Sequence, residues 1–191
     1  MKSFINATIE KISTPTDEQL LGEILKALEK HSVFVGIPEE KAERKEPGSM
    51  DNATLLYIHT NGSAVKNIPS RPVIEPAIED KENAFKLNKL FLNAALEGMK
   101  GNEQGMLFQL GRIGMAAQNM CRDWFTSPKN GWAPNQPATV KGKLRRSKMS
   151  KKKRKAAWEA YQAGEMIKGE PVDRPLIDTG DLRKSITYVV E

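Results

Sequence analysis

Two consecutive helical patterns fill the middle of this 191-residue chain and restrict what it can fold into. The patterns cover residues 74–99 and 104–125, with Gly101 between them. In the second pattern, apolar residues recur at the spacing of an inward-facing helix stripe. Small residues in the same stretch, among them Gly111 and Gly114, suit close contact between helices although glycine lowers helix propensity. The sequence therefore predicts two long helices that pack closely.

Shorter helical patterns lie on both sides of this centre. A capping box introduces the apolar pattern of residues 17–30, which predicts an amphipathic helix. Asn52 is placed to cap a second short helix, and Asn61-Gly62 is a suitable end for it. A further segment with helical content follows at residues 149–166.

Two short runs have the composition of β-strands. Residues 32–37 are rich in β-branched and aromatic side chains and stop at Pro38, and residues 185–190 alternate in the same way. We expect the two strands to be neighbours in one sheet. Charge and proline content predict irregular structure for residues 39–50 and 127–140.

The net charge of +6 is concentrated in one segment. Ten of the fifteen residues 141–155 are Lys or Arg, and no acid occurs between Asp123 and Glu159. Such a segment binds phosphates through counterion release, although it lacks the interleaved aromatic residues that stack on bases. Contact with DNA, contact with an acidic neighbouring subunit and a solvated loop all remain open. The candidate contact residues are Lys143, Arg145, Arg146, Lys148, Lys151, Lys152, Lys153, Arg154 and Lys155.

Other residue patterns argue against several classes of protein. Cys121 is the single cysteine, which excludes an internal disulfide, and its apolar helical surroundings predict a buried side chain. His31 and His59 lie far apart, without Cys or His at ligand spacing, so neither a metal site nor a cofactor is expected. The sequence has neither an apolar run of membrane-spanning length nor a signal-peptide pattern. We therefore expect a protein that is made in a cytoplasm and acts without a membrane.

The segment Leu-Ile-Asp-Thr-Gly at residues 176–180 has two incompatible interpretations. It matches the active-site turn of aspartic proteases, but that chemistry needs two carboxylates that share a proton. No second Asp-Thr-Gly or Asp-Ser-Gly occurs, and residues 181–191 are too few to build a substrate cleft. A structural role is favoured, with Asp178 or Thr179 as the N-cap of a short helix. The sequence therefore predicts that the protein is not an enzyme.

Taken in order, several segments resemble one known family. A Pro-Ser-Arg-Pro segment enters the first long helix, Trp-Ala-Pro-Asn follows the second, and Leu-Ile-Asp-Thr-Gly precedes the last strand. In this order they resemble the virion morphogenesis proteins of tailed bacteriophages, which are neck or tail-completion components that join head to tail. The positions that carry the motifs are Pro69, Arg71, Pro72, Trp132, Pro134, Thr139, Leu176, Asp178, Thr179 and Gly180.

The resemblance implies an α+β subunit, with long helices packed on a small, mostly antiparallel sheet and with extended loops or arms. The length of the chain predicts one domain over residues 1–191. The resemblance covers roughly residues 30–190, and a basic insertion at about residues 141–170 is longer than the usual family connection. It also implies a cyclic homo-oligomer, a hexamer or a dodecamer, between the portal or adaptor and the tail proteins. The subunit would be assembled in the host cytoplasm and reside in the virion, without catalysis.

The residues leave some alternatives open. Trp132 is a candidate anchor for a subunit interface, or it folds back on its own helix. Arg71 is a second interface candidate, although a salt bridge within the subunit is favoured. The long loops at residues 38–51 and 126–148 are candidates for reaching a neighbouring subunit. The alternative function is a small basic nucleic-acid-binding module that uses residues 141–155.

Overall fold

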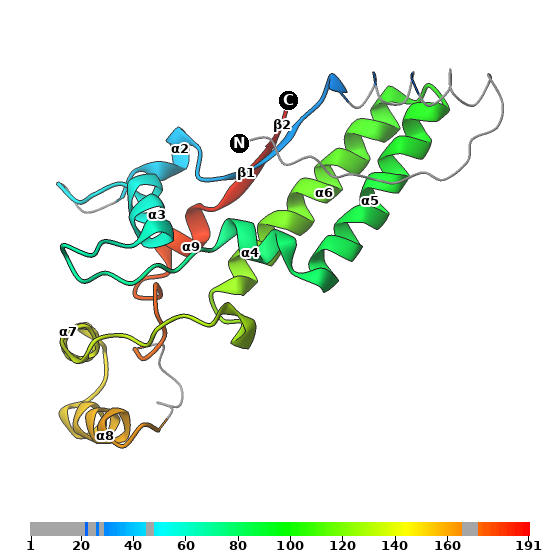
Figure 1. Ribbon diagram of the computed structural model, residues 1–191. Helices are drawn as coiled ribbons and strands as arrows, with labels where there is room; N and C mark the ends of the chain where they lie inside the picture. Colours follow the sequence, from blue (N-terminus) through cyan, green and yellow to red (C-terminus); the bar gives the residue numbers. More distant parts are fainter. Residues whose placement is uncertain (1–21, 23–25, 27–28, 45–47, 166–171) are drawn as a thin grey trace.

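The computed structural model describes residues 22, 26, 29–44, 48–165 and 172–191. Within them, helices pack on a small antiparallel sheet, which confirms the predicted α+β class (Figure 1). The elements in chain order are β1 (Val33–Gly36), α2 (Glu39–Ala42), α3 (Asn52–Asn61), α4 (Ile74–Glu79), α5 (Lys81–Met99), α6 (Glu103–Trp124), the 3-10 helix η1 (Pro128–Asn130), α7 (Pro137–Arg146), α8 (Lys151–Gln162), α9 (Asp181–Ser185) and β2 (Thr187–Val190).

The long helices α5 and α6 form a hairpin, and both strands run along α6 (Figure 1). Asn102 caps α6 by accepting a hydrogen bond from the amide of Gly105 at 3.0 Å. Apolar residues of both helices, including the buried Ala94 and Leu110, form one core cluster with Val35 of β1. The close packing of two long helices that the sequence predicts is therefore present.

The strands β1 and β2 are antiparallel neighbours, as the sequence predicts. Their register pairs Val33 with Val190 and Phe34 with Val189. Side chains alternate between the two faces of a strand, so Val33 and Val190 pack against the helical hairpin while Phe34 and Val189 are exposed. The ribbon thus joins a segment near the start of the described chain to its end.

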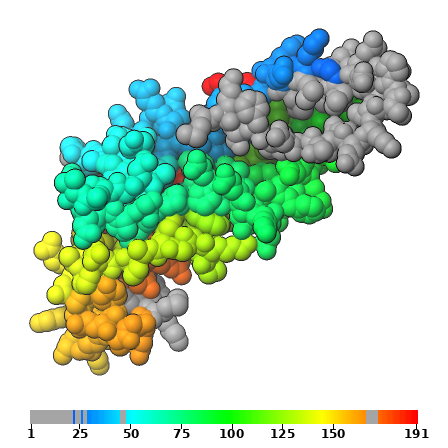
Figure 2. All heavy atoms as spheres, viewed as in Figure 1, coloured from blue at the N-terminus to red at the C-terminus, as the bar shows by residue number. Residues whose placement is uncertain are grey.

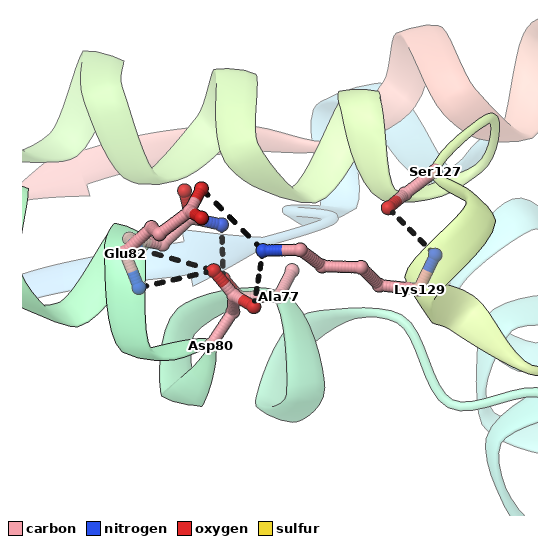
Figure 3. A network of polar contacts seen from close by, with 6 residues as sticks. Ala77, Asp80, Glu82, Ser127 and Lys129 are labelled. Carbon is pink, nitrogen blue, oxygen red and sulfur yellow. Dashed lines mark hydrogen bonds and ion pairs between the residues drawn. The ribbon is translucent and has the colours of Figure 1, made fainter.

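The predicted helix over residues 74–99 is divided at Asp80, which is a correction to the sequence analysis. Asp80 has an extended backbone, with ψ of 130°, and its carboxylate accepts hydrogen bonds from the amides of Glu82 and Asn83. Asp80 therefore caps α5 and ends α4, because an N-cap residue cannot keep helical geometry. Lys129 holds the same carboxylate at 3.0 Å and reaches Glu82 at 3.4 Å (Figure 3).

Local side-chain and backbone geometry accounts for three further corrections to the sequence analysis. The cap of α3 is Asp51 rather than Asn52, since the Asp51 carboxylate accepts from the amide of Thr54 at 2.8 Å. The cap of α9 is Gly180, in the left-handed region at φ of 82°, rather than Asp178 or Thr179. The segment predicted to be irregular at residues 127–140 contains η1 and the first turn of α7, which starts at Pro137. Proline fits that position because the first helical residue needs no amide hydrogen.

Other helix predictions have mixed outcomes. The charged loop predicted at residues 39–50 begins with the short helix α2. The predicted segment at residues 149–166 contains α8. Most of the helix predicted over residues 17–30 lies outside the described residues, although Gly22, Lys26 and Glu29 are helical.

Two arginines tie α6 to the end of the chain. Arg122 donates hydrogen bonds to the carbonyl oxygens of Lys184 at 3.0 Å and Ile186 at 2.7 Å. Arg183 donates in the opposite direction, from Nε to the carbonyl of Arg122 at 2.7 Å. These reciprocal bonds fix α9 and the start of β2 against the C-terminal half of α6, beside the buried Ile186.

The helices α7 and α8 form a separate small layer with a core of its own. The cluster contains Val140 and Leu144 of α7 with Ala157 of α8, and Val172 completes it. Figures 1 and 2 show the two helices at one end of the molecule, and Figure 1 shows the loop that joins α5 to α6 at the other end. We call residues 137–162 the basic arm, because all ten Lys and Arg residues of the charged segment lie within them.

Gly114 of α6 provides a test of how β2 packs. A Cβ placed there would lie 2.2 to 2.9 Å from three atoms of the Tyr188 ring. We expect Gly114→Ala to lower the free energy of unfolding by about 1–2 kcal/mol, because the ring must move despite the better helix propensity. Urea unfolding followed by circular dichroism measures the change.

Gly111 on the same helix is the matched control, since nothing lies within 4 Å of a Cβ placed there. We expect Gly111→Ala to raise the free energy of unfolding by up to ~1 kcal/mol through helix propensity alone. If both substitutions change the stability equally, Tyr188 does not pack on Gly114.

Candidate functional site

The three motif segments singled out in the sequence meet around one cavity of about 440 Å³. We call it the motif cavity. The helix α3 lines one side with Asn52 and His59, and the segment 66–71 follows it. The start of α7, with Thr139 and Lys143, and the segment 176–182 close the remaining sides. Residues that are far apart along the chain thus share one site.

Arg71 holds two of the motif segments together. Its side chain is 6% exposed and donates hydrogen bonds to the carbonyl of Ala133, from Nε at 3.2 Å and from Nη2 at 2.8 Å. Nη2 also donates to the carbonyl of Pro134 at 3.1 Å. Among the described residues Arg71 thus bonds to backbone carbonyls and forms no ion pair, whereas the sequence analysis favours a salt bridge. Burial lowers the pKa of the Arg71 guanidinium.

Trp132 makes a second contact between the same two segments, from the other side. Its indole Nε1 donates a hydrogen bond to the carbonyl of Pro72 at 3.1 Å. The half-buried ring meets Phe125 edge to face, with 5.8 Å between the ring centroids. The indole is thus engaged within its own subunit, as the second of the two alternatives for Trp132 expects.

Lys143 fixes the third motif segment. It is 6% exposed, and its ammonium group donates to the carbonyls of Arg174 at 2.7 Å and Ile177. Burial lowers the pKa of Lys143, and the nearby Asp178 partly opposes this effect. Lys143 was predicted as a surface contact for DNA or a subunit, and the structure corrects this because the ammonium is buried and bonded internally.

Asn135 and Tyr161 reinforce the same junction. The Asn135 amide donates to the carbonyls of Val172 at 3.3 Å and Asp173 at 3.2 Å, and the Tyr161 hydroxyl donates to the carbonyl of Asn135 at 2.8 Å. The sequence analysis missed both roles. The available signal in the sequence was a polar residue inside a proline-rich segment. In the structure Asn135 is buried, and a buried polar side chain needs hydrogen-bond partners.

The polar side chains of the Asp-Thr-Gly turn are engaged within the subunit. Asp178 forms an ion pair with Arg146 at 2.7 Å. The Thr179 hydroxyl donates a hydrogen bond to Asp181 at 2.8 Å. Each carboxylate thus has its own partner, whereas an aspartic protease needs two carboxylates that share a proton. Arg146 is accordingly engaged in an internal ion pair at one edge of the basic arm.

Three polar atoms at the motif cavity have no hydrogen-bond partner among the described residues. They are Oδ1 of Asn52, Nδ1 of His59 and Nε of Arg44. Asn52 is 3% exposed, so its oxygen is also shielded from bulk water. Burial and the charge of Arg71 together lower the pKa of His59, which keeps the imidazole neutral. The sequence analysis did not single out Asn52 as a site residue, because its unpaired state depends on the tertiary packing.

The charge around the motif cavity is predominantly positive. Arg44, Lys66, Arg71 and Lys143 line it together with Asp178 and Asp181. None of these four cations belongs to an ion pair formed by the described residues. The cavity therefore holds cationic side chains that lack a neutralising partner within that part of the chain.

The basic arm presents a second charged feature. Seven of the predicted contact residues are exposed: Arg145, Arg146, Lys148, Lys151, Lys152, Lys153 and Lys155. Arg154 is half-buried and donates to the carbonyl of Arg145 at 3.4 Å. Lys141 lies 4.6 Å from the centre of the Trp158 ring, which stacks on Tyr161. The aromatic pair therefore belongs to the small core of the arm and to a cation–π contact.

The remaining candidate chemistry of the described residues concerns metal ions, membranes and the cysteine. No group of three or more His, Cys, Asp or Glu residues suited to a metal ion occurs among them. No helix in that part of the chain is both long and apolar enough to cross a bilayer. Cys121 is buried as predicted, and burial raises the pKa of its thiol to about 12.

Comparisons with models of protein families, with curated proteins and with solved structures found no match to this chain.

The neutral state of His59 predicts a pH dependence of stability. Its pKa in the folded protein lies below the ordinary value near 6.5, so the unfolded chain binds the proton first as the pH falls. The stabilisation is complete above about pH 7 and is lost as the pH falls towards the folded pKa. We expect the free energy of unfolding of the wild type to decrease from about pH 7 to about pH 5 more than that of His59→Gln.

His31→Gln is the control for a general effect of histidine replacement. Urea unfolding at a series of pH values gives the difference between each variant and the wild type. Parallel curves for the wild type and His59→Gln would show that the folded and unfolded states bind this proton equally.

Proposed function

We propose that this chain is a structural subunit of a tailed-phage neck, in which a ring of copies joins the head to the tail during virion assembly. The sequence basis is the order of the motif segments. One structural observation supports the proposal: two motif side chains and one lysine of the basic segment hold the separate motif segments together. Arg71 and Trp132 join two of these segments, and Lys143 secures the third. Such residues maintain the shape of a building block.

Exposed apolar side chains on the helical hairpin support assembly. On α5, Phe85, Leu92 and Met99 recur every seven residues, and Leu92 is 61% exposed. On α6, Phe108 and Met115 are also seven residues apart and exposed. Residues seven apart lie on one side of a helix, so each helix presents an apolar stripe to solvent. Contiguous exposed apolar surface marks sites of protein association.

A closed ring needs two different faces on each subunit, because rotation places one face of each copy against the other face of the next. We propose the surface that carries the α5 stripe of Phe85, Leu92 and Met99 as one of the two. The remaining neighbours in this proposal are the portal or adaptor, the tail proteins and the DNA that passes through the neck. A hexamer and a dodecamer are both compatible with this arrangement.

Electron microscopy of the purified chain and of assembled necks tests the proposal directly. We expect a ring with cyclic symmetry that contains this chain between head and tail. Virions that lack the chain, or a protein that stays monomeric under all assembly conditions, would contradict it.

A second candidate function is nucleic-acid binding by the basic arm. Lys151, Lys152 and Lys153 occupy the first turn of α8, without an acidic residue there. The positive end of a helix dipole normally favours acidic residues, so this placement opposes the stability of the isolated helix. Phosphate groups would relieve the repulsion and release counterions. The exposed lysines at the start of α8 are therefore the observation that favours this candidate.

Replacement of Leu92 tests the apolar stripe. The side chain is exposed in the subunit, so we expect Leu92→Glu to leave the free energy of unfolding within about 0.5 kcal/mol of the wild type. We expect it to abolish ring formation, because the interface would bury an unpaired charge. Sedimentation velocity and negative-stain microscopy measure the oligomer.

Asn93→Glu adds the same charge at the neighbouring exposed position and is the matched control. We expect rings from the control at the wild-type yield. If the Leu92→Glu protein assembles as well as the control, the α5 stripe is not part of the interface.

Charge reversal at Lys151, Lys152 and Lys153 separates the two candidate functions. A nucleic-acid-binding module predicts tight DNA binding by the free monomer, with a plot of log K against log salt that becomes shallower by up to ~3 in the triple Glu variant. A neck subunit predicts weak binding by the monomer. Gel shifts at rising salt concentrations give both the affinity and the slope.

The control carries the same three-charge reversal at the exposed residues Lys81, Lys86 and Lys89 of α5. We expect its salt slope to match that of the wild type. Equal losses in both variants would show a response to net charge rather than a contact made by α8.

A further inference from the structure

We propose that the motif cavity is a docking site for an acidic, extended peptide segment of a partner protein. A carboxylate of the peptide would be held by the basic side chains of the cavity, and its backbone by Asn52. This inference goes beyond the neck assignment, since it concerns what a single subunit binds and can be measured on the isolated chain.

The first argument is that the cavity lining carries four cations and two carboxylates, and that none of the four cations forms an ion pair with a described residue. Arg71 and Lys143 are more than nine-tenths buried, and neither forms an ion pair with a described residue. The hydrogen bonds of Arg71 use Nε and Nη2, which leaves Nη1 without a bond to the described part of the chain. Buried charge is costly unless it is paired, and a guanidinium recognises a carboxylate with its remaining donors. A negatively charged group is therefore the complement of this cavity.

The second argument is the unpaired polar atoms, which point to a ligand with hydrogen-bond donors as well as charge. Asn52 is 3% exposed, and its Oδ1 accepts no hydrogen bond from the described residues. A side-chain amide carries an acceptor beside a donor, which complements a peptide group. Inorganic anions at neutral pH offer few donors for Oδ1, whereas the N–H of a peptide backbone satisfies it. This feature favours a peptide over a small inorganic anion.

The remaining lining favours a peptide over a nucleotide. Aliphatic side chains, among them Leu55, Ile68 and Leu182, lie beside the cations. Phe, Tyr and Trp are absent from the described lining, so a base would lack the aromatic platforms on which it usually stacks. An aliphatic neighbour of the acidic residue in a peptide would instead pack on these side chains.

The backbone of the cavity wall is also unusual. Asn67 at φ of 51° and Leu176 at φ of 58° are the non-glycine residues with positive φ in the described chain, and both line the cavity. Such conformations cost free energy and recur at sites that clamp a ligand. The positive φ values are a supporting observation. The inference itself depends on the charge of the cavity and on its unpaired polar atoms.

The test begins with a library of random heptapeptides displayed against the full-length chain. The peptide that is enriched is then synthesised, together with a twin in which Asp and Glu are replaced by Asn and Gln. We expect the enriched sequences to share an acidic residue beside an aliphatic one. Titration calorimetry should show binding at least about tenfold weaker for the uncharged twin.

Lys66→Glu reverses an exposed charge at the cavity, so it tests the site without disturbing the buried hydrogen bonds. We expect it to weaken the peptide about tenfold or more. Lys86→Glu makes the same change on an exposed position of α5, away from the cavity, and should bind as the wild type does. Equal affinity for both variants would overturn the proposed location.

Asn52→Ala provides a second variant with a different expected effect on stability. It removes a buried oxygen that has no partner among the described residues, so we expect unchanged or greater stability together with weaker peptide binding. Unchanged binding would overturn the role of Asn52 in the proposal.

Three other outcomes of the screen would overturn the proposal. One is the enrichment of peptides without acidic residues, and another is the absence of any enriched peptide. The third is inorganic phosphate or a short oligonucleotide that displaces the peptide at comparable concentration, since this would identify a general anion site. Ring formation is scored separately by microscopy, so failure here leaves the neck proposal standing.

Discussion

Two buried cations donate hydrogen bonds to backbone carbonyls, and these bonds hold together the part of the molecule around the motif cavity. Arg71 fastens the entry of α4 to the proline-rich segment after α6, and Lys143 fastens α7 to the segment before α9. Each donor satisfies carbonyl groups of irregular backbone that would otherwise lack partners. The cost of burying the charges is thereby partly offset, and segments without regular structure obtain a fixed geometry around the motif cavity.

The part of the molecule formed by the helical hairpin and the two strands is stabilised by a different kind of contact. The hairpin of α5 and α6 and the ribbon of β1 and β2 are held by apolar packing, with glycine at position 114 leaving room for the ring of Tyr188. Apolar side chains also remain on the outer surface of the hairpin. The two parts suit the proposed role of a ring subunit, since one offers association surface and the other offers a polar cavity and a basic arm.

Elements with a repeated local pattern of apolar residues were predictable, because the pattern can be read from neighbouring residues alone. The period of apolar residues identified α6, and the alternation of residues 185–190 identified β2 and its pairing with β1. The division at Asp80 was missed because an aspartate inside a helical pattern is also compatible with a continuous helix. Its capping role depends on hydrogen bonds to two local amides and on Lys129, which lies far along the chain (Figure 3).

The sequence by itself determined the two long helices, the two short strands, the burial of Cys121 and the concentration of charge in one segment, because composition and periodicity do not depend on distant contacts. The tertiary structure decided which of those charges are on the surface. Lys143 and Lys152 are the same residue type in one basic segment, yet Lys143 is buried and Lys152 is exposed. Helix geometry turns every third or fourth side chain inward, and the inward Lys143 met unpaired carbonyls contributed by segment 174–177.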